Sequence, residues 1–194
     1  MQNDFNPKSP FETFKTCGPY NNEADAVNRL EKVLLKADIF TIYREVCGEY
    51  EYRPHYKDSN KTPRIDFLLT PKKNLIDTGW PFGAIGIECK KSNVKIGKPL
   101  SQIMDYSTAV FRIPKFNILI KPDFIFLWPC ESTHGDIASL MAQNRFGTVC
   151  ETGNNSDWHR LIFFCGESRV LTYKFNGKID IPKQLNFGKR TGSR

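Results

Sequence analysis

The stretch GAIGIECKKSNVKIGKPLSQIMDY, residues 83–106, decides how this chain folds, because an apolar run in it leads directly into Glu88 and Lys90. Residues 83–91 are short and largely apolar, as expected of a strand whose two faces are both covered. Side chains alternate across a strand, so Glu88 and Lys90 share one face and Cys89 lies on the other. The pattern predicts a strand that delivers a carboxylate and an ammonium group to one side of a sheet.

A second strand precedes this stretch. In RIDFLLT, residues 64–70, apolar side chains recur at every second position from Ile65, so we expect Asp66 on the opposite face. Neighbouring strands would then bring Asp66 to Glu88 and Lys90. Two carboxylates form a hard oxygen site that suits Mg²⁺ or Mn²⁺, and a lysine beside them can orient a water nucleophile and offset charge on phosphorus. The residues predict phosphodiester hydrolysis, and the alternative is a purely structural ion pair.

A helix is expected before these strands. Apolar residues at helical spacing predict a helix that begins after Asn22, its N-cap, and runs to about Ala37. Glu23 falls within the apolar stripe of this helix, where a carboxylate is costly unless something pairs with it. We expect that Glu23 either contributes to the metal site or lies in solvent, where it favours the helix dipole.

A second helix is expected after the charged strand, over residues 99–112. Gln102 and Tyr106 lie one turn apart on a strip beside its apolar stripe, and Ala109 continues that strip. If the stripe packs on the sheet, both polar side chains face the Glu88 side. The same spacing also occurs by chance on many helices.

The remaining pattern completes the predicted fold class, an α/β fold with a mixed β-sheet flanked by helices and an extra C-terminal β-hairpin. A loop is expected over residues 71–82. We divide the chain into an irregular lead-in (1–20), a single domain (21–182) and a basic, flexible tail (183–194). Further strands are expected at 40–52 and 123–129, and a helix is expected at 135–145. The two hairpin strands are expected at 160–166 and 170–177.

Composition limits the classes of function. The 194 residues suffice for one sizeable core, and the net charge of +7 fits a polyanionic partner, although many basic proteins bind none. No apolar stretch is long enough to span a membrane, so we expect a cytoplasmic protein without a membrane partner. The six cysteines form no C-x-x-C pair, so we expect no zinc.

Basic residues follow the charged strand and fill the end of the chain. They can contact phosphates without reading bases, or they can simply be solvated. Trp80, Trp128 and Trp158 can stack on bases, but we expect at least two of them in the core. The basic residues near the strand are Lys91, Lys95 and Lys98, and those of the tail are Lys183, Lys189, Arg190 and Arg194.

The order of these motifs resembles that of the PD-(D/E)xK nuclease superfamily, in its RecB-like branch. The motifs are a helix Glu, the Asp of RID, the E-x-K of IECK and the Q-x-x-x-Y of QIMDY. The match covers residues 22–112. The resemblance implies a restriction-endonuclease-like fold and makes Asp66, Glu88 and the Cys89 backbone carbonyl metal ligands. Glu23 would join them directly or through water. Gln102 and Tyr106 would position the nucleophile or the substrate phosphates.

The chain also departs from the family pattern. The motif reads P-R-I-D, with Arg64 between Pro63 and Ile65, and the C-terminal cysteine group of members with an iron–sulfur cluster is missing, so no cluster is expected. The resemblance implies a Mg²⁺- or Mn²⁺-dependent DNA nuclease in phage-type or mobile-element DNA replication, recombination or defence. The alternatives are a nuclease-fold protein that binds nucleic acid without cutting it and an RNA endonuclease. A homo-oligomer is possible, as is a helicase or replication partner. The choice between endonuclease and exonuclease action also stays open.

Overall fold

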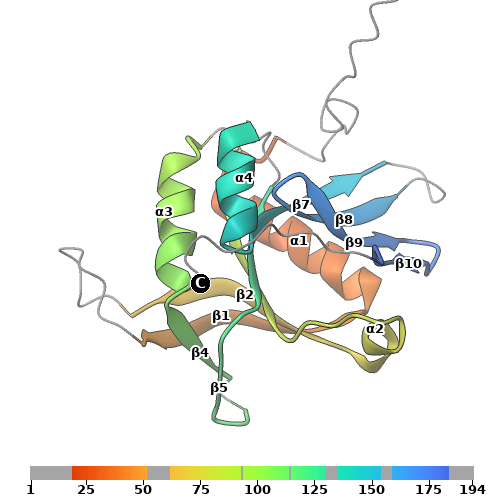
Figure 1. Cartoon of the computed structure of the whole chain (residues 1–194), viewed down its shortest axis with the longest axis horizontal. Helices are drawn as coiled ribbons and strands as arrows, with labels where there is room; N and C mark the ends of the chain where they lie inside the picture. The colour runs from red at the N-terminus through yellow and green to blue at the C-terminus, as the bar shows by residue number, and fades with distance from the viewer. Residues whose placement is uncertain are drawn as a thin grey trace, which may run out of the picture.

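The computed structural model describes residues 19–51, 62–92, 94–113, 115–129, 135–153 and 159–183 (Figure 1). These residues form a mixed α/β structure with a large, mostly antiparallel sheet and helices on both of its faces. Residues 1–18 of the predicted lead-in and 184–194 of the predicted tail lie outside the described ranges.

The helices are α1 (Glu23–Ala37), α2 (Lys73–Asp77), α3 (Gly97–Tyr106) and α4 (Gly135–Gln143). The strands of the first half are β1 (Phe40–Tyr50), β2 (Arg64–Pro71), β3 (Ile85–Cys89), β4 (Ala109–Ile113) and β5 (Ile118–Ile120). Those of the second half are β6 (Phe124–Trp128), β7 (Phe146–Thr152), β8 (Arg160–Cys165), β9 (Ser168–Lys174) and β10 (Ile179–Asp180).

The described strands form one sheet in the order β10-β9-β8-β7-β6-β3-β2-β1-β4-β5. Strand β6 runs parallel to its neighbours β3 and β7, and the other neighbouring pairs are antiparallel. Parallel neighbours need a long connection, and α3 lies in the connection from β3 to β6 while α4 lies in that from β6 to β7. All five residues of β3 are buried, which confirms the prediction of a strand covered on both faces.

Each face of the sheet has its own core cluster. On one face, Leu30 and Leu34 of α1 belong to a cluster with Phe67 and Ile87 of the central strands. On the other face, α3 and α4 contribute Ile103 and Met141 to a cluster that includes Leu68 and Leu127. The sheet is therefore a layer between α1 on one side and α3 with α4 on the other (Figure 1).

The start of α1 is as the sequence predicts. The Asn22 side chain accepts a hydrogen bond from the Asp25 backbone N–H at 2.8 Å, which caps the first turn. The helix ends at Ala37, where the cap residue Asp38 takes a left-handed conformation and its N–H bonds back to Leu34. This element is confirmed at both ends.

The second predicted helix is wrong at its C-terminal end. Helix α3 ends at Tyr106, and Ala109 begins β4 instead of continuing a polar strip on a helix. Thr108 Oγ1 donates to the Asp105 carbonyl and the Thr108 carbonyl accepts from Glu51 N–H, so the chain already turns into the sheet here. Met104, near the end of this helix, is 48% exposed.

Other short elements were missed. The expected loop over 71–82 contains α2, whose Leu75 is fully buried, and β5, β7 and β10 are strands that the pattern did not reveal. The C-terminal hairpin is confirmed, since β8 and β9 pair in antiparallel register. Trp80 and Trp128 are buried as expected, and Trp158 lies outside the described residues. None of the described helices has the length and apolar character needed to cross a membrane.

Candidate metal centre

The candidate site lies where β2 and β3 separate. Their antiparallel pairing ends at Phe67 and Ile87, whereas β3 continues beside β6 as far as Cys89. The Asp66 carboxylate occupies the fork, where its Oδ2 accepts a hydrogen bond from the Cys89 backbone N–H at 2.7 Å. Asp66 thus gives the Cys89 N–H the hydrogen-bond partner that the backbone of β2 no longer supplies where the two strands diverge.

The route by which Asp66 reaches this position differs from simple alternation. Ile65 belongs to the core cluster on the α3 side and Phe67 to the cluster on the α1 side, so the predicted shared face of these two residues is wrong. Glu45, which lies in β1 between the residues that pair with Phe67 and Ile65, has φ of 48°. A residue in the left-handed conformation interrupts the regular pleat. The alternation of side chains between the two faces of the sheet therefore shifts at this level in both β1 and β2.

Glu88 is the most buried carboxylate of the site, with 3% of its surface exposed. Its Oε1 accepts hydrogen bonds from Lys90 Nζ at 2.5 Å and from Gln102 Nε2 at 2.6 Å. Its Oε2 is buried and has no hydrogen-bond partner among the described residues. A buried carboxylate oxygen without a partner is costly and is a typical position for a ligand.

Glu23 completes a group of three carboxylates. Ligand atoms of Glu23, Asp66 and Glu88 all lie within 4.8 Å of one another. Glu23 Oε1 lies 3.1 Å from Lys90 Nζ, and its side chain is 51% exposed. The structure therefore combines the two possibilities for Glu23, because it faces the site from the first turn of α1 and is still open to solvent.

The charges in this group act against one another. Burial, together with the nearby Asp66 carboxylate, raises the pKa of Glu88 to about 7, even though Lys90 opposes this change. Burial also raises the pKa of Asp66. For Lys90, burial favours the neutral form, but the charges and hydrogen bonds of Glu88 and Glu23 together raise the pKa above its ordinary value. The site holds more negative charge than Lys90 alone can balance.

Gln102 and Tyr106 form a chain of hydrogen bonds from α3 to the fork. Gln102 Nε2 donates to the Tyr106 hydroxyl at 2.7 Å, and that hydroxyl donates to the Arg64 carbonyl at 2.6 Å. Tyr106 is 5% exposed and belongs to the core cluster, so its predicted position beside the apolar stripe is wrong. Burial raises the pKa of Tyr106. Tyr106 holds Gln102 in place against Glu88. The Arg64 carbonyl anchors the tyrosine, and a backbone partner of this kind leaves no signal in the sequence.

Cys89 contributes through its backbone. Its side chain is buried in the core cluster on the α1 side, and burial raises the pKa of the thiol. Its N–H holds Asp66, as described above. The Cys89 carbonyl as a metal ligand stays a prediction.

The predicted phosphate-binding residues are only partly within the described chain. Lys91, Lys95 and Lys98 are exposed on the segment that leads from β3 into α3. Lys189 and Arg190 lie outside the described residues. Lys91 directly follows Lys90, and Lys95 and Lys98 lie further along the chain.

The donor set fits a divalent cation that prefers oxygen. Three carboxylates of two strands and one helix converge, and one buried oxygen of Glu88 has no hydrogen-bond partner in the part of the chain that the structure describes. Mg²⁺ and Mn²⁺ bind such carboxylate sets and keep waters in the remaining positions.

Comparisons with known proteins give no relative: no family model matches the chain, no curated protein is similar to it, and no solved structure matches it.

Proposed function

We propose that this chain is a metal-dependent nuclease of restriction-endonuclease-like fold, in the PD-(D/E)xK class. One observation carries the proposal: Glu23, Asp66 and Glu88 converge within 4.8 Å at the fork of β2 and β3, with Lys90 Nζ 2.5 Å from Glu88. A structural ion pair would require only the last two residues. Burial and the two additional carboxylates raise the pKa of Glu88 and make the site costly without a cation.

Asp66 and Glu88 would hold Mg²⁺ or Mn²⁺, with Glu23 as a further ligand. When bound, the cation supplies Lewis-acid chemistry at a phosphate oxygen and lowers the pKa of coordinated water. Oε2 of Glu88, which has no hydrogen-bond partner within the described ranges, can bind the cation while Oε1 keeps its bonds to Lys90 and Gln102.

Lys90 is the residue that we assign to the reacting atoms. Its Nζ lies between Glu88 and Glu23, and its side chain is 19% exposed. Because the pKa of Lys90 is raised, the ammonium group keeps its proton. A protonated lysine at this position stabilises negative charge on the phosphate and orients the attacking water. Gln102 and Tyr106 act through Glu88 as positioning residues, because their hydrogen bonds end on Glu88 and on β2.

DNA is the proposed substrate. The net charge of +7 and the exposed Lys91, Lys95 and Lys98, which follow Lys90 in the chain, fit a phosphate backbone. The phosphate contacts proposed for these lysines come from one segment and do not read base edges. The affinity for DNA should therefore fall steeply with salt concentration.

The test is cleavage of supercoiled circular DNA, linear duplex DNA and labelled RNA, each with Mg²⁺, with Mn²⁺ and with chelator. We expect wild type to cut DNA only with a metal ion. Asp66→Asn and Lys90→Ala should each lose at least about 100-fold of the rate. The matched control is Asp77→Asn, an exposed carboxylate on α2 that pairs with Lys73. Cutting of circular DNA indicates an endonuclease, and equal cutting by Asp66→Asn contradicts the proposal.

A further inference from the structure

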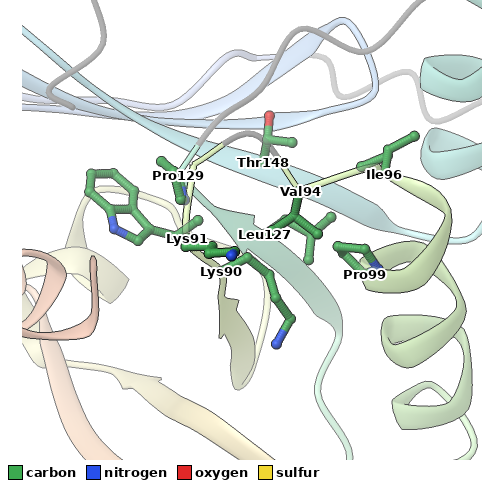
Figure 2. A pocket seen from close by; sticks show the side chains of 9 residues that line it. Lys90, Lys91, Val94, Ile96, Pro99, Leu127, Pro129 and Thr148 are labelled. Carbon is green, nitrogen blue, oxygen red and sulfur yellow. The ribbon is translucent and has the colours of Figure 1, made fainter. Parts of the chain in front are cut away.

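Trp128 lies where the helix that carries Glu23 meets the strand end that precedes Lys90. It is the last residue of β6, is 1% exposed, and belongs to the core cluster on the α1 side. Its chain neighbours Leu127 and Pro129 lie around a small recess next to Lys90, which Trp128 also lines (Figure 2). Trp128 is therefore close to both of the segments that bear Glu23 and Lys90.

Two hydrogen bonds of Trp128 join these segments. Its backbone carbonyl accepts from the Lys90 N–H at 2.7 Å, which continues the parallel pairing of β3 and β6. Its indole Nε1–H donates to the Ala26 carbonyl at 3.0 Å, a buried contact between residues 102 positions apart in the chain. Ala26 lies in the first turn of α1 with Glu23. One residue thus holds both the backbone of Lys90 and the turn that presents Glu23.

A second set of contacts closes the same junction. The Tyr20 N–H donates to Ser92 Oγ at 2.8 Å, and the Ser92 N–H donates to the Tyr20 carbonyl at 3.1 Å. The Tyr20 ring also packs on Trp128, with the ring centroids 6.1 Å apart. Tyr20 comes shortly before Glu23 and Ser92 shortly after Lys90 in the chain. We call Trp128, Tyr20 and Ser92 the Trp128 junction.

The contact between Glu23 and Lys90 is too weak to fix the direction of Glu23 by itself. The Glu23 side chain is 51% exposed, and an ion pair open to solvent contributes little because water and salt screen it. Asp66 and Glu88 carry the same charge as Glu23 and repel it. A buried hydrogen bond is stronger than a solvated one because the surroundings have a low dielectric constant. The position of Glu23 therefore depends on the junction.

We infer that Trp128 is a positioning residue for the metal centre, because its indole N–H holds the first turn of α1 so that Glu23 stays with Asp66 and Glu88. The inference rests on the metal ligands of the proposed nuclease. Residues that orient metal ligands through hydrogen bonds typically change metal affinity about 10- to 100-fold when they are replaced. Trp128 acts through Glu23, so its effect on metal affinity must disappear when Glu23 is no longer a ligand.

The test is a calorimetric titration of Mn²⁺ into four full-length proteins, namely wild type, Trp128→Phe, Glu23→Gln and the double variant. Phenylalanine keeps an aromatic ring in the core and lacks the indole N–H, while the backbone carbonyl that pairs with Lys90 remains. We expect Trp128→Phe to weaken Mn²⁺ binding about tenfold and to cause no further loss in the Glu23→Gln background. Equal losses in the two backgrounds, or no loss in either, overturn the inference.

Trp80→Phe is the matched control. Trp80 is 4% exposed in the same core cluster, and its indole nitrogen has no hydrogen-bond partner among the residues that the structure describes. The substitution therefore removes the same atoms from the same core without removing a hydrogen bond. Mn²⁺ affinity should stay at the wild-type value. A loss as large as that in Trp128→Phe would assign the effect to core packing and overturn the inference.

A variant of Ser92 decides the question where Trp128→Phe does not fold. Ser92→Ala removes the acceptor of the Tyr20 N–H and should weaken Mn²⁺ binding only where Glu23 is present. Ser92→Thr keeps a hydroxyl group and should retain the wild-type affinity. Unchanged affinity in Ser92→Ala contradicts a junction that holds Glu23.

The junction and the nuclease proposal fail in different ways. If wild type binds Mn²⁺ and cuts DNA but Trp128→Phe has the same effect with and without Glu23, the positioning role is wrong and the nuclease proposal stands. If the effect depends on Glu23 but wild type cuts no nucleic acid, the positioning role stands and the cleavage proposal is wrong. Absence of Mn²⁺ binding by wild type overturns both.

Discussion

Glu88 is a carboxylate that the fold buries at a cost. It is 3% exposed, one of its oxygens has no partner among the described residues, and the neighbouring Asp66 carboxylate repels it. A buried group of this kind destabilises the metal-free protein whenever it is ionised. Such groups concentrate at functional sites, where the cost is offset once a ligand binds.

The first prediction concerns the pH dependence of the metal-free protein. Because the pKa of Glu88 is raised from 4.5 to about 7, the folded state binds more protons than the unfolded state between these values. The free energy of unfolding therefore falls as pH rises from 4.5 to 7, by about 3 kcal/mol from this group. Urea unfolding in chelator should show this fall in wild type and a much smaller one in Glu88→Gln.

An exposed carboxylate provides the control. Glu167 lies in the turn between β8 and β9, and Glu167→Gln should keep the wild-type fall in stability. If Glu88→Gln and wild type have the same pH dependence, the cost that we assign to the buried carboxylate is wrong.

The second prediction distinguishes positioning from direct catalysis. Gln102→Ala removes one of the two donors to Glu88 Oε1 and should lower kcat by about tenfold, with little effect on KM. A change in KM alone for Gln102→Ala would show that Gln102 contacts substrate instead of orienting Glu88.

At the scale of elements, the sequence predicts the strands and helix that carry the site but not the geometry that joins them. The E-x-K alternation placed Cys89 in one core and Glu88 opposite it, as the structure shows. The position of Asp66 depends on a left-handed Glu45 in another strand, which no local pattern reveals. The end of α3 was also missed, because Val110 and Phe111 continue helical spacing while they belong to β4.

The third prediction concerns α1. Asn22 caps the turn that carries Glu23, so Asn22→Ala should cost about 1 kcal/mol of stability and let that turn fray. Mn²⁺ affinity should fall by a few-fold while Asp66 and Glu88 remain in place. Calorimetric titration measures this change, and Asn22→Ser, which restores a capping side chain, should recover it. Unchanged affinity in Asn22→Ala would remove Glu23 from the ligand set.

At the scale of the whole molecule, α1 is held to the sheet by hydrogen bonds to the buried carboxylate of Glu151. Glu151 of β7 has a fully buried side chain and accepts from Arg29 of α1 through Nε at 2.9 Å and a terminal nitrogen at 2.5 Å. His159 Nε2 lies 2.6 Å from the same carboxylate. These contacts fix the rotation of α1 about its axis, and thereby the direction in which Glu23 faces.

The fourth prediction follows from these contacts. Arg29→Ala leaves the Glu151 carboxylate buried without its bidentate partner and should cost about 2 kcal/mol of unfolding free energy. The double variant Arg29→Ala with Glu151→Gln removes the buried charge and should recover part of the loss. Urea unfolding of wild type, both single variants and the double variant tests this, and additive losses in the double variant would show that the two residues do not act as a pair.

The arrangement of the sheet is the part that the sequence did not predict. The parallel strand β6 lies between β3 and β7, and the short β5 and β10 form the two edges of the sheet among the described strands. Strand β7 is buried along its whole length, so it lacks the alternation that marks a half-exposed strand. The hairpin of β8 and β9 was predictable because its pairing is local.

The most direct test of the metal centre is a calorimetric titration of Mn²⁺ into the full chain. We expect saturable binding by wild type, binding at least about tenfold weaker in Asp66→Asn, and unchanged binding in Asp77→Asn, whose carboxylate is on α2. Absence of binding by wild type, or equal affinity in Asp66→Asn, would contradict the assignment of Glu23, Asp66 and Glu88 as a metal centre.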